Sequence, residues 1–172
     1  TFLVLAQGVP DLNAFLVPFK EKFGEYILEQ EILTMTSVHR FNFRFFYEGG
    51  QLLHTQYPEE LNRPDIDNLD YAIISYLAAN SRLGLSKIAK ACKVHPNVIR
   101  YRIEKLKKAG ILGTPVLDID FKKFGVEQYQ VDFSLKNQAS VQSIIDFIAP
   151  LPEATFATVT LGKYDLAVEF AV

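Results

Sequence analysis

The stretch from residue 66 to residue 113 constrains the fold most, because it predicts three short helices joined by tight turns. Apolar residues recur at helical spacing over 67–80, 85–92 and 96–108. Pro96 stands at the first position of the third helix, where its missing N–H leaves no hydrogen bond unmade. Two short helices joined by a tight turn inside a three-helix unit describe a helix-turn-helix.

Positive charge is concentrated in the same stretch. Residues 87–108 hold eight lysines and arginines against one acid, Glu104, which gives a local charge of +7 and leaves −9 for the rest of the chain. A basic patch on an acidic body is typical of a small nucleic-acid-binding module. A solvated helix face rich in lysine would carry the same charge, so charge alone leaves both interpretations open.

The third helix of this block has the residue types that read DNA. In a helix-turn-helix the second helix of the motif enters the major groove, and Asn, Arg and Lys can pair there with adenine, guanine and phosphate. Ile99, Ile103 and Leu106 form the apolar stripe, so the opposite side should face DNA. A helical hairpin with an incidental basic face is the alternative. The candidate DNA-binding residues are Ser86, Lys87, His95, Asn97, Arg100, Tyr101, Lys105 and Lys108.

Strands and helices alternate on both sides of the helical block. Residues 1–50 predict an apolar strand over 2–6, a helix over 11–23 and a segment rich in β-formers over 26–47. Residues 51–65 contain two prolines and no clear period, which indicates a linker. The remainder predicts a helix near 140–149 and strands over 116–119, 128–135, 157–161 and 166–172.

The central block also carries a series of spaced motifs, namely Ile66-Asp67-x-x-Asp70-x-x-Ile73-Ile74-x-x-Leu77, Asn80-x-Arg82, Ile88-Ala89, Val94 and Arg102-Ile103-x-x-Leu106-x-x-x-Gly110-Ile111. Further motifs follow at Leu117-Asp118, Phe124-Gly125 and Val159-Thr160-x-Gly162-x-Tyr164-Asp165-Leu166. Together they resemble the Lrp/AsnC family, the leucine-responsive or feast/famine transcription regulators. The resemblance covers about 66–172, and it rests on the combined motifs because each one alone is weak.

This resemblance implies an α+β fold in which a winged helix-turn-helix is flanked by partial ferredoxin-like (βαββαβ) ligand-sensing domains. Residues 1–50 would be the C-terminal part of one sensing domain, 51–65 a linker, 66–125 the winged helix-turn-helix with a connecting strand, and 126–172 the N-terminal part of a second sensing domain. We therefore expect a fragment of a tandem-repeat member, with 2–6 and 166–172 as equivalent strands. In the alternative arrangement the two halves pair with each other, within one chain or across a dimer, to complete a sheet.

The function that the resemblance implies is a sequence-specific transcription regulator that responds to a small ligand such as an amino acid. It implies double-stranded DNA as partner, a homodimer or larger assembly, a cytoplasmic location, and neither enzymatic activity nor a cofactor. The alternative is a sensing or oligomerisation module whose helix-turn-helix mediates protein contacts. The implied effector site is the turn Gly162, Lys163, Tyr164 and Asp165, for which an ordinary β-hairpin turn is the competing interpretation.

Two positions depart from the family pattern. Lys93 stands at the turn where the family usually has glycine, and His95 stands where serine usually caps the third helix. A non-glycine residue in a left-handed conformation costs on the order of 1 kcal/mol. DNA binding by this helix would therefore have to tolerate both changes.

Other chemistry finds little support in the sequence. His39, His54 and His95 stand far apart and no metal-ligand spacing is present, Cys92 is expected to lie in a core, and no apolar run is long enough to span a bilayer. The aromatic run 41–47 could stack on RNA bases, but it lacks the glycines of that motif and is better explained as sheet core.

Overall fold

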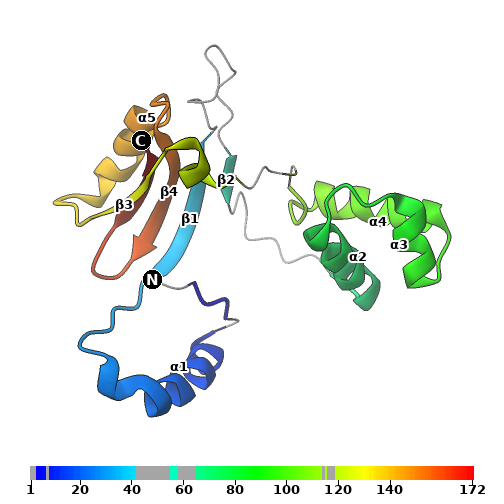
Figure 1. Ribbon diagram of the computed structural model, residues 1–172, viewed down its shortest axis with the longest axis horizontal. Helices are drawn as coiled ribbons and strands as arrows, with labels where there is room; N and C mark the ends of the chain where they lie inside the picture. Colours follow the sequence, from blue (N-terminus) through cyan, green and yellow to red (C-terminus); the bar gives the residue numbers. More distant parts are fainter. Residues whose placement is uncertain (1–2, 7, 42–54, 58–64, 114, 116–118) are drawn as a thin grey trace.

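The computed structural model describes residues 3–6, 8–41, 55–57, 65–113, 115 and 119–172. Figure 1 shows three parts: a sheet with helix α5 on one face, a three-helix unit to one side of the sheet, and helix α1 below the end of the sheet where β1 starts. The helices are α1 (Val9–Phe23), α2 (Asn68–Ala79), α3 (Leu85–Cys92), α4 (Pro96–Lys108) and α5 (Val141–Ile148). The strands are β1 (Thr34–Arg40), β2 (Thr55–Tyr57), β3 (Gln128–Phe133), β4 (Ala154–Leu161) and β5 (Leu166–Ala171).

The sheet joins strands from the two ends of the chain. Its order is β2-β1-β4-β5-β3, and every neighbouring pair is antiparallel. β1 runs along β4 from the pair Thr34 and Leu161 to the pair Arg40 and Phe156. The N-terminal and C-terminal blocks therefore share one sheet within a single chain, which is the second of the two arrangements considered from the sequence.

Helix α5 covers only part of one sheet face. Ile145 and Ile148 pack there on a cluster that includes Phe41, Leu166 and Val168. The register places Tyr129, Val131 and Phe133 of β3 opposite Phe170, Val168 and Leu166 of β5. All six β3 residues are nevertheless exposed, and none of them belongs to the core cluster under α5. The apolar face predicted for 128–135 exists, but it is only partly covered.

The three-helix unit has its own core. Ile73 of α2, Ile88 of α3 and Ile99 and Leu106 of α4 are at most 1% exposed. Cys92 lies half-buried beside this core. The ends of all three helices agree with the sequence prediction within one residue. The unit is thus a helix-turn-helix with a preceding helix, and its shape is set by one small cluster of aliphatic side chains.

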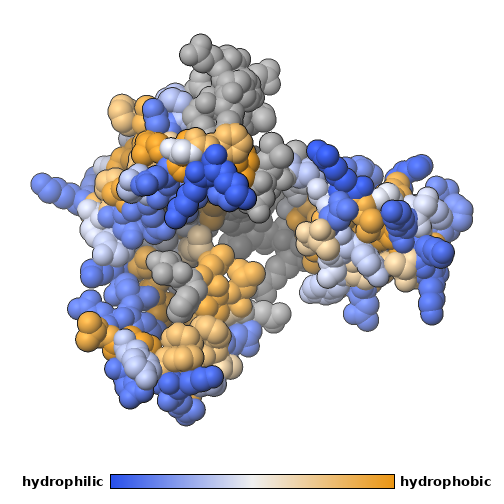
Figure 2. Space-filling model, viewed as in Figure 1, coloured by the Kyte–Doolittle hydropathy of each residue, from blue (hydrophilic) through white to orange (hydrophobic). Residues whose placement is uncertain are grey.

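Of the α-helices that the structure describes, α1 alone has no buried residue. Phe15, Phe19 and Phe23 follow one another along it with ring centroids 5.8 Å and 5.1 Å apart. None of its fifteen residues is buried against the described part of the chain. Figure 2 shows hydrophobic side chains over this helix at the bottom of the view. The helix predicted over 11–23 is confirmed, but no residue of its apolar face is buried by the described part of the chain.

Several strand predictions differ from the structure. Residues 3–6 form no strand, and Leu3 and Leu5 are 67% and 90% exposed, because no described strand lies beside them. The prediction that 2–6 and 166–172 are equivalent strands is therefore wrong over the described residues. The stretch 51–65, interpreted as a linker, contains β2, which needs only backbone pairing with β1 and hence no side-chain period.

Other predictions fall outside what the structure describes. Phe41 is buried in the sheet core, but the rest of the aromatic run 41–47 lies outside the described residues. The same holds for most of the strand predicted over 116–119, and for the wing expected after α4.

Candidate nucleic-acid interface

The packing of α4 decides which of its residues face solvent. Ile99, Ile103 and Leu106 are buried against α2 and α3. A helix turns about 100° per residue, so the opposite side carries Asn97, Tyr101, Glu104 and Lys108, with Arg100 at its edge, and all five are exposed. Tyr101 is 69% exposed. α4 therefore presents a polar and cationic row on a helix whose other side is fixed in a core.

The turn before α4 has the geometry expected of a helix-turn-helix, although its residues are unusual. Lys93 ends α3 in the left-handed conformation, with φ 57°, and its N–H donates to the carbonyls of Ala89 and Lys90. His95 caps α4: its Nδ1 accepts from the N–H of Asn97 at 3.2 Å. Both departures seen in the sequence thus occupy the positions expected for them, and the turn still closes.

Ser86 and Lys87 lie in the first turn of α3, and both are exposed. With the row on α4 they place polar and cationic groups on two successive helices. Backbone N–H groups at a helix start and nearby lysines are common contacts to DNA phosphates. Among the eight candidate DNA-binding residues, Ser86, Lys87, His95, Asn97, Arg100, Tyr101 and Lys108 are exposed.

Lys105, the eighth candidate, lies in a different environment. Its ammonium donates to the carbonyl of Asp65 at 3.1 Å and lies 3.9 Å from Oδ2 of Asp70. Both partners belong to the start of α2 or the residues just before it. Lys105 is half-buried and turned toward α2, so its ammonium already has contacts within the protein.

A group of charged residues joins α4 to the start of α2. Nη1 of Arg102 lies 2.6 Å from Oδ2 of Asp67 and 3.0 Å from Oδ2 of Asp70. Asp67 and Asp70 also form a capping box, in which the Asp67 carboxylate accepts from the N–H groups of Leu69 and Asp70. One guanidinium therefore binds both carboxylates of the α2 cap. Arg102, Asp67, Asp70 and Lys105 are called the capping cluster below.

Within the capping cluster the contacts stabilise the ionised forms of Asp67 and Arg102. The N–H of Asp70 and, next, the guanidinium of Arg102 hold the pKa of Asp67 below its ordinary value. Arg102 in turn has a raised pKa, chiefly because it donates to Asp67. Asp70 is fully buried, and its Oδ1 has no hydrogen-bond partner among the described residues. A buried carboxylate of this kind depends on its counter-ion.

The sequence prediction did not include this cluster as a set of contacts. The signal was present: Asp67-x-x-Asp70 has capping-box spacing, and Arg102 lies three residues after Ile99 and four before Leu106. Arg102 therefore borders the buried stripe of α4. Only the placement of α2 beside α4 shows that the two features meet.

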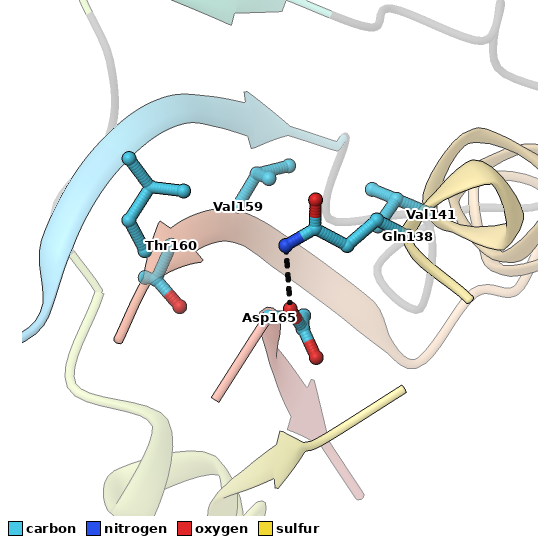
Figure 3. Close-up of a pocket in the computed structure, with 6 residues that line it drawn as sticks. Gln138, Val141, Val159, Thr160 and Asp165 are labelled. Carbon is cyan, nitrogen blue, oxygen red and sulfur yellow. Dashed lines mark hydrogen bonds between the residues drawn. The ribbon is translucent and has the colours of Figure 1, made fainter. Parts of the chain in front are cut away.

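The predicted effector turn lies at the end of the hairpin β4–β5. Asp165 accepts from the N–H of Leu135 at 2.7 Å and from Nε2 of Gln138 at 3.1 Å. These two hydrogen bonds lower the pKa of Asp165, the one from Leu135 most. Figure 3 shows the Gln138 amide pointing to Asp165 beside a shallow pocket of about 170 Å³. The pocket is lined by Gln138, Val141, Val159, Thr160, Leu161 and Asp165.

The other residues of this turn contact the protein itself. Gly162 has φ 142°, and a Cβ there would lie 2.7 Å from Cδ2 of Leu33 and 3.0 Å from the carbonyl oxygen of Ile32. The ammonium of Lys163 lies 5.6 Å from the ring centre of Tyr164. Glycine is therefore needed at 162 because Ile32 and Leu33, just before β1, lie close to its backbone, and not because a ligand does.

Neither a metal site nor a membrane span is found in the described residues. No group of three His, Cys, Asp or Glu side chains there could hold a metal ion. No helix of that part combines the length and the hydropathy needed to cross a bilayer.

Comparisons with known proteins agree with this geometry. The AsnC-type helix-turn-helix domain matches residues 66–107. The regulatory protein AsnC of Escherichia coli strain K12 is 32% identical over 105 residues, which cover 60% of this chain and 69% of AsnC. The HTH-type transcriptional regulator LysM of Saccharolobus solfataricus is 32% identical over 116 residues, which cover 63% of this chain and 75% of LysM.

A solved structure shows the same likeness in three dimensions. The structure of E. coli AsnC superposes with a TM-score of 0.55 and 32% identity, over 63% of this chain and 73% of that one. These relatives are named as regulators and not as enzymes. Fold, motif and relatives together show that the chain belongs to the Lrp/AsnC family of helix-turn-helix transcription regulators.

Proposed function

We propose that this chain is a sequence-specific DNA-binding regulator that reads the major groove with α4. The observation that carries the proposal is the exposed row Asn97, Arg100, Tyr101 and Lys108 on a helix held in a buried core. Side chains near the start of such a helix meet base edges, and those further along meet the backbone. Arg100 would therefore contact a base, and Lys108 a phosphate.

Ser86 and Lys87 would add phosphate contacts from the start of α3, and His95 would do so from the turn. Their exposure and their place beside the α4 row support this assignment. Lys105 is the weakest member of the proposed set, because its ammonium contacts Asp65 and approaches Asp70. We expect Lys105 to stabilise the packing of α4 on α2 more than it contributes to DNA contacts.

A gel shift with a salt titration tests the proposed DNA binding. Arg100→Ala should cost about 1–3 kcal/mol of binding free energy and relax the sequence preference, because one base contact is lost. Lys108→Ala should weaken binding to all sequences alike and reduce the salt slope by about one unit, because one phosphate contact is lost. Unchanged affinity in both variants would favour the protein-contact function instead.

We further propose that the sheet and α5 belong to a ligand-sensing domain, with β1 supplied by the N-terminal block and residues 126–172 by the C-terminal block. The effector, such as an amino acid, would bind beside the turn Gly162, Lys163, Tyr164 and Asp165. The adjoining pocket and its polar lining residues Gln138, Thr160 and Asp165 support this place. A homodimer or larger assembly would cover the exposed apolar residues of β3 and complete the site.

Calorimetry against the standard amino acids tests the effector proposal. We expect weak binding or none by this 172-residue chain. Asp165 already accepts two hydrogen bonds, and the side chain of Leu33 fills the space beside Gly162. Tight binding would show that the site is complete in this chain. If a chain extended to a whole sensing domain also binds no amino acid, the effector proposal is wrong.

A further inference from the structure

Arg102 lies inside the most basic stretch of the chain, but its guanidinium points away from the proposed DNA row. Its Nη1 lies within 3.0 Å of a carboxylate oxygen of Asp67 and of another of Asp70. On a helix of about 100° per residue, Arg102 and Lys105 lie between the buried stripe and the exposed row. They form the edge of α4 that meets the start of α2.

We propose that Arg102 is a positioning residue for DNA recognition, which fixes the rotation of α4 by binding the two carboxylates of the α2 cap. The proposal rests on the DNA-binding function proposed above and assigns a role within it. Arg102 itself makes no DNA contact in this arrangement. Its effect on DNA reaches the row Asn97, Arg100, Tyr101 and Lys108 through the orientation of the helix.

The physical reason is that the two kinds of contact on α4 constrain different things. Ile99, Ile103 and Leu106 hold the helix against the core, but apolar contact is non-directional. A charge-assisted hydrogen bond has a defined direction and length. The hydrogen bonds of Arg102 lie to one side of the packed stripe, where they can oppose rotation of α4 about its axis. Asp70 is fully buried, and without Arg102 its carboxylate would keep only the longer 3.9 Å contact with the Lys105 ammonium, so the Arg102 contact is costly to break.

The cap itself supplies the anchor. Asp67 and Asp70 are held by backbone N–H groups at the first turn of α2, where a negative charge is favoured. Lys105 adds a hydrogen bond to the carbonyl of Asp65, just before that turn. Arg102 and Lys105 of α4 therefore both bind groups at or just before the first turn of α2.

Asp67→Asn is the main test, because asparagine caps a helix as well as aspartate does and only the charge is lost. The probes are the duplex that the 172-residue wild-type chain selects from a randomised pool, and the pool itself. Removing an acid near DNA should tighten binding by simple electrostatics. We expect the opposite: affinity for the selected duplex falls about two- to fivefold, as for loss of one half-exposed ion pair, and affinity for the pool does not fall.

Glu104→Gln is the matched control, since Glu104 is an exposed acid on α4, the helix that carries Arg102, and within the described part of the chain its carboxylate pairs with Lys107 and not with the α2 cap. It should bind the selected duplex as well as the wild type or more tightly. If Asp67→Asn also binds as well or more tightly, Arg102 has no positioning role and the inference is overturned.

Arg102→Gln and Arg102→Lys separate positioning from a direct contact with DNA. We expect Arg102→Gln to lose about tenfold in affinity for the selected duplex, equal to about one misread base pair, with the salt slope unchanged. Arg102→Lys should recover part of the loss because it keeps the charge. A salt slope reduced by about one unit, with equal losses on both probes, would make Arg102 a phosphate contact and overturn the inference.

Circular dichroism at the assay temperature establishes that each variant is folded. If Arg102→Gln is unfolded, the comparison of Asp67→Asn with Glu104→Gln decides alone. If the wild-type chain selects no sequence from the pool, the proposed function fails and this inference fails with it. If it selects a sequence and the variants behave as the overturning outcomes describe, only the inference fails.

Discussion

The three-helix unit and the sheet of this chain reach their structures from different kinds of contact. The unit takes its core from residues 69–112, so each helix packs on one that lies close to it in sequence. The sheet depends on β1 and β4, whose paired residues stand about 120 positions apart. The first part buries its apolar stripes almost completely, whereas the second leaves β3 and α1 uncovered.

This difference shows what helical spacing does and does not settle. α4 and α1 both have an apolar stripe, and both form helices. α4 buries Ile99, Ile103 and Leu106, while α1 buries nothing among the described residues. Periodicity therefore fixes the element and the face, and a neighbour at the right distance decides whether that face is packed.

The largest expected effect lies in the core of the three-helix unit. Ile99→Ala should lower the free energy of unfolding by about 2–5 kcal/mol, because a fully buried side chain leaves a cavity. Urea denaturation followed by circular dichroism measures the change. The exposed Tyr101→Ala should stay within about 0.5 kcal/mol. A loss as small for Ile99→Ala would mean that the core is less tightly packed than described.

Gly162→Ala should destabilise the sheet, where contacts join residues far apart in the chain. Its Cβ would meet Leu33 and Ile32, and φ 142° is strained for alanine, so the cost should be about 1–3 kcal/mol. Gly24→Ala is the matched control, since Gly24 is helical and has no atom near its Cβ position. Equal stability of the two variants would show that the segment before β1 does not pack against this turn in solution.

A smaller gain in stability is expected at the turn before α4. Lys93 has φ 57°, a left-handed conformation that glycine adopts without strain. Lys93→Gly should therefore raise the free energy of unfolding by about 0.5–1 kcal/mol. The same denaturation experiment measures it. Lys90→Gly, inside α3, serves as control and should destabilise by a similar amount. If both substitutions destabilise, the left-handed turn is not the source of strain.

The smallest effect concerns pH and the sheet. Burial raises the pKa of Glu169 on β5 above its ordinary value. Its contribution to stability is therefore fully present below the unfolded-state pKa of 4.5, and is lost as pH rises through the folded-state pKa. Glu169→Gln should accordingly stabilise the chain at pH 7 relative to the wild type, and this advantage should vanish near pH 3. Stability curves of both proteins against pH test this; a constant difference would contradict it.

The helical unit could be predicted almost completely from its sequence. Its helix ends, its buried stripe and the roles of Lys93 and His95 follow from spacing, capping and turn chemistry, which act over a few residues. The same local rules predicted α1, α5, β3 and most of the β4–β5 hairpin. They failed for residues 3–6, because an apolar run becomes a strand only beside another strand.

The candidate site was predicted in part. Exposure of the α4 row follows from the buried stripe opposite it, so the sequence alone indicated Asn97, Arg100, Tyr101 and Lys108. It could not separate Lys105 from the other cations, because all are basic residues on one helix, and it left Arg102 out of the candidate set without indicating what Arg102 contacts. The contacts with Asp65, Asp67 and Asp70 lie more than thirty residues away along the chain.

The sequence by itself determined the helix-turn-helix, its basic surface and its family, because these depend on residues close together in the chain. Only the tertiary structure decided that β1 joins β4, that Gly162 makes room for Leu33, and that one arginine binds both carboxylates of the α2 cap. The physical reason is that strand pairing and ion pairs join groups distant in sequence. Their partners are specified by the distance and direction between elements and not by the local pattern of either one.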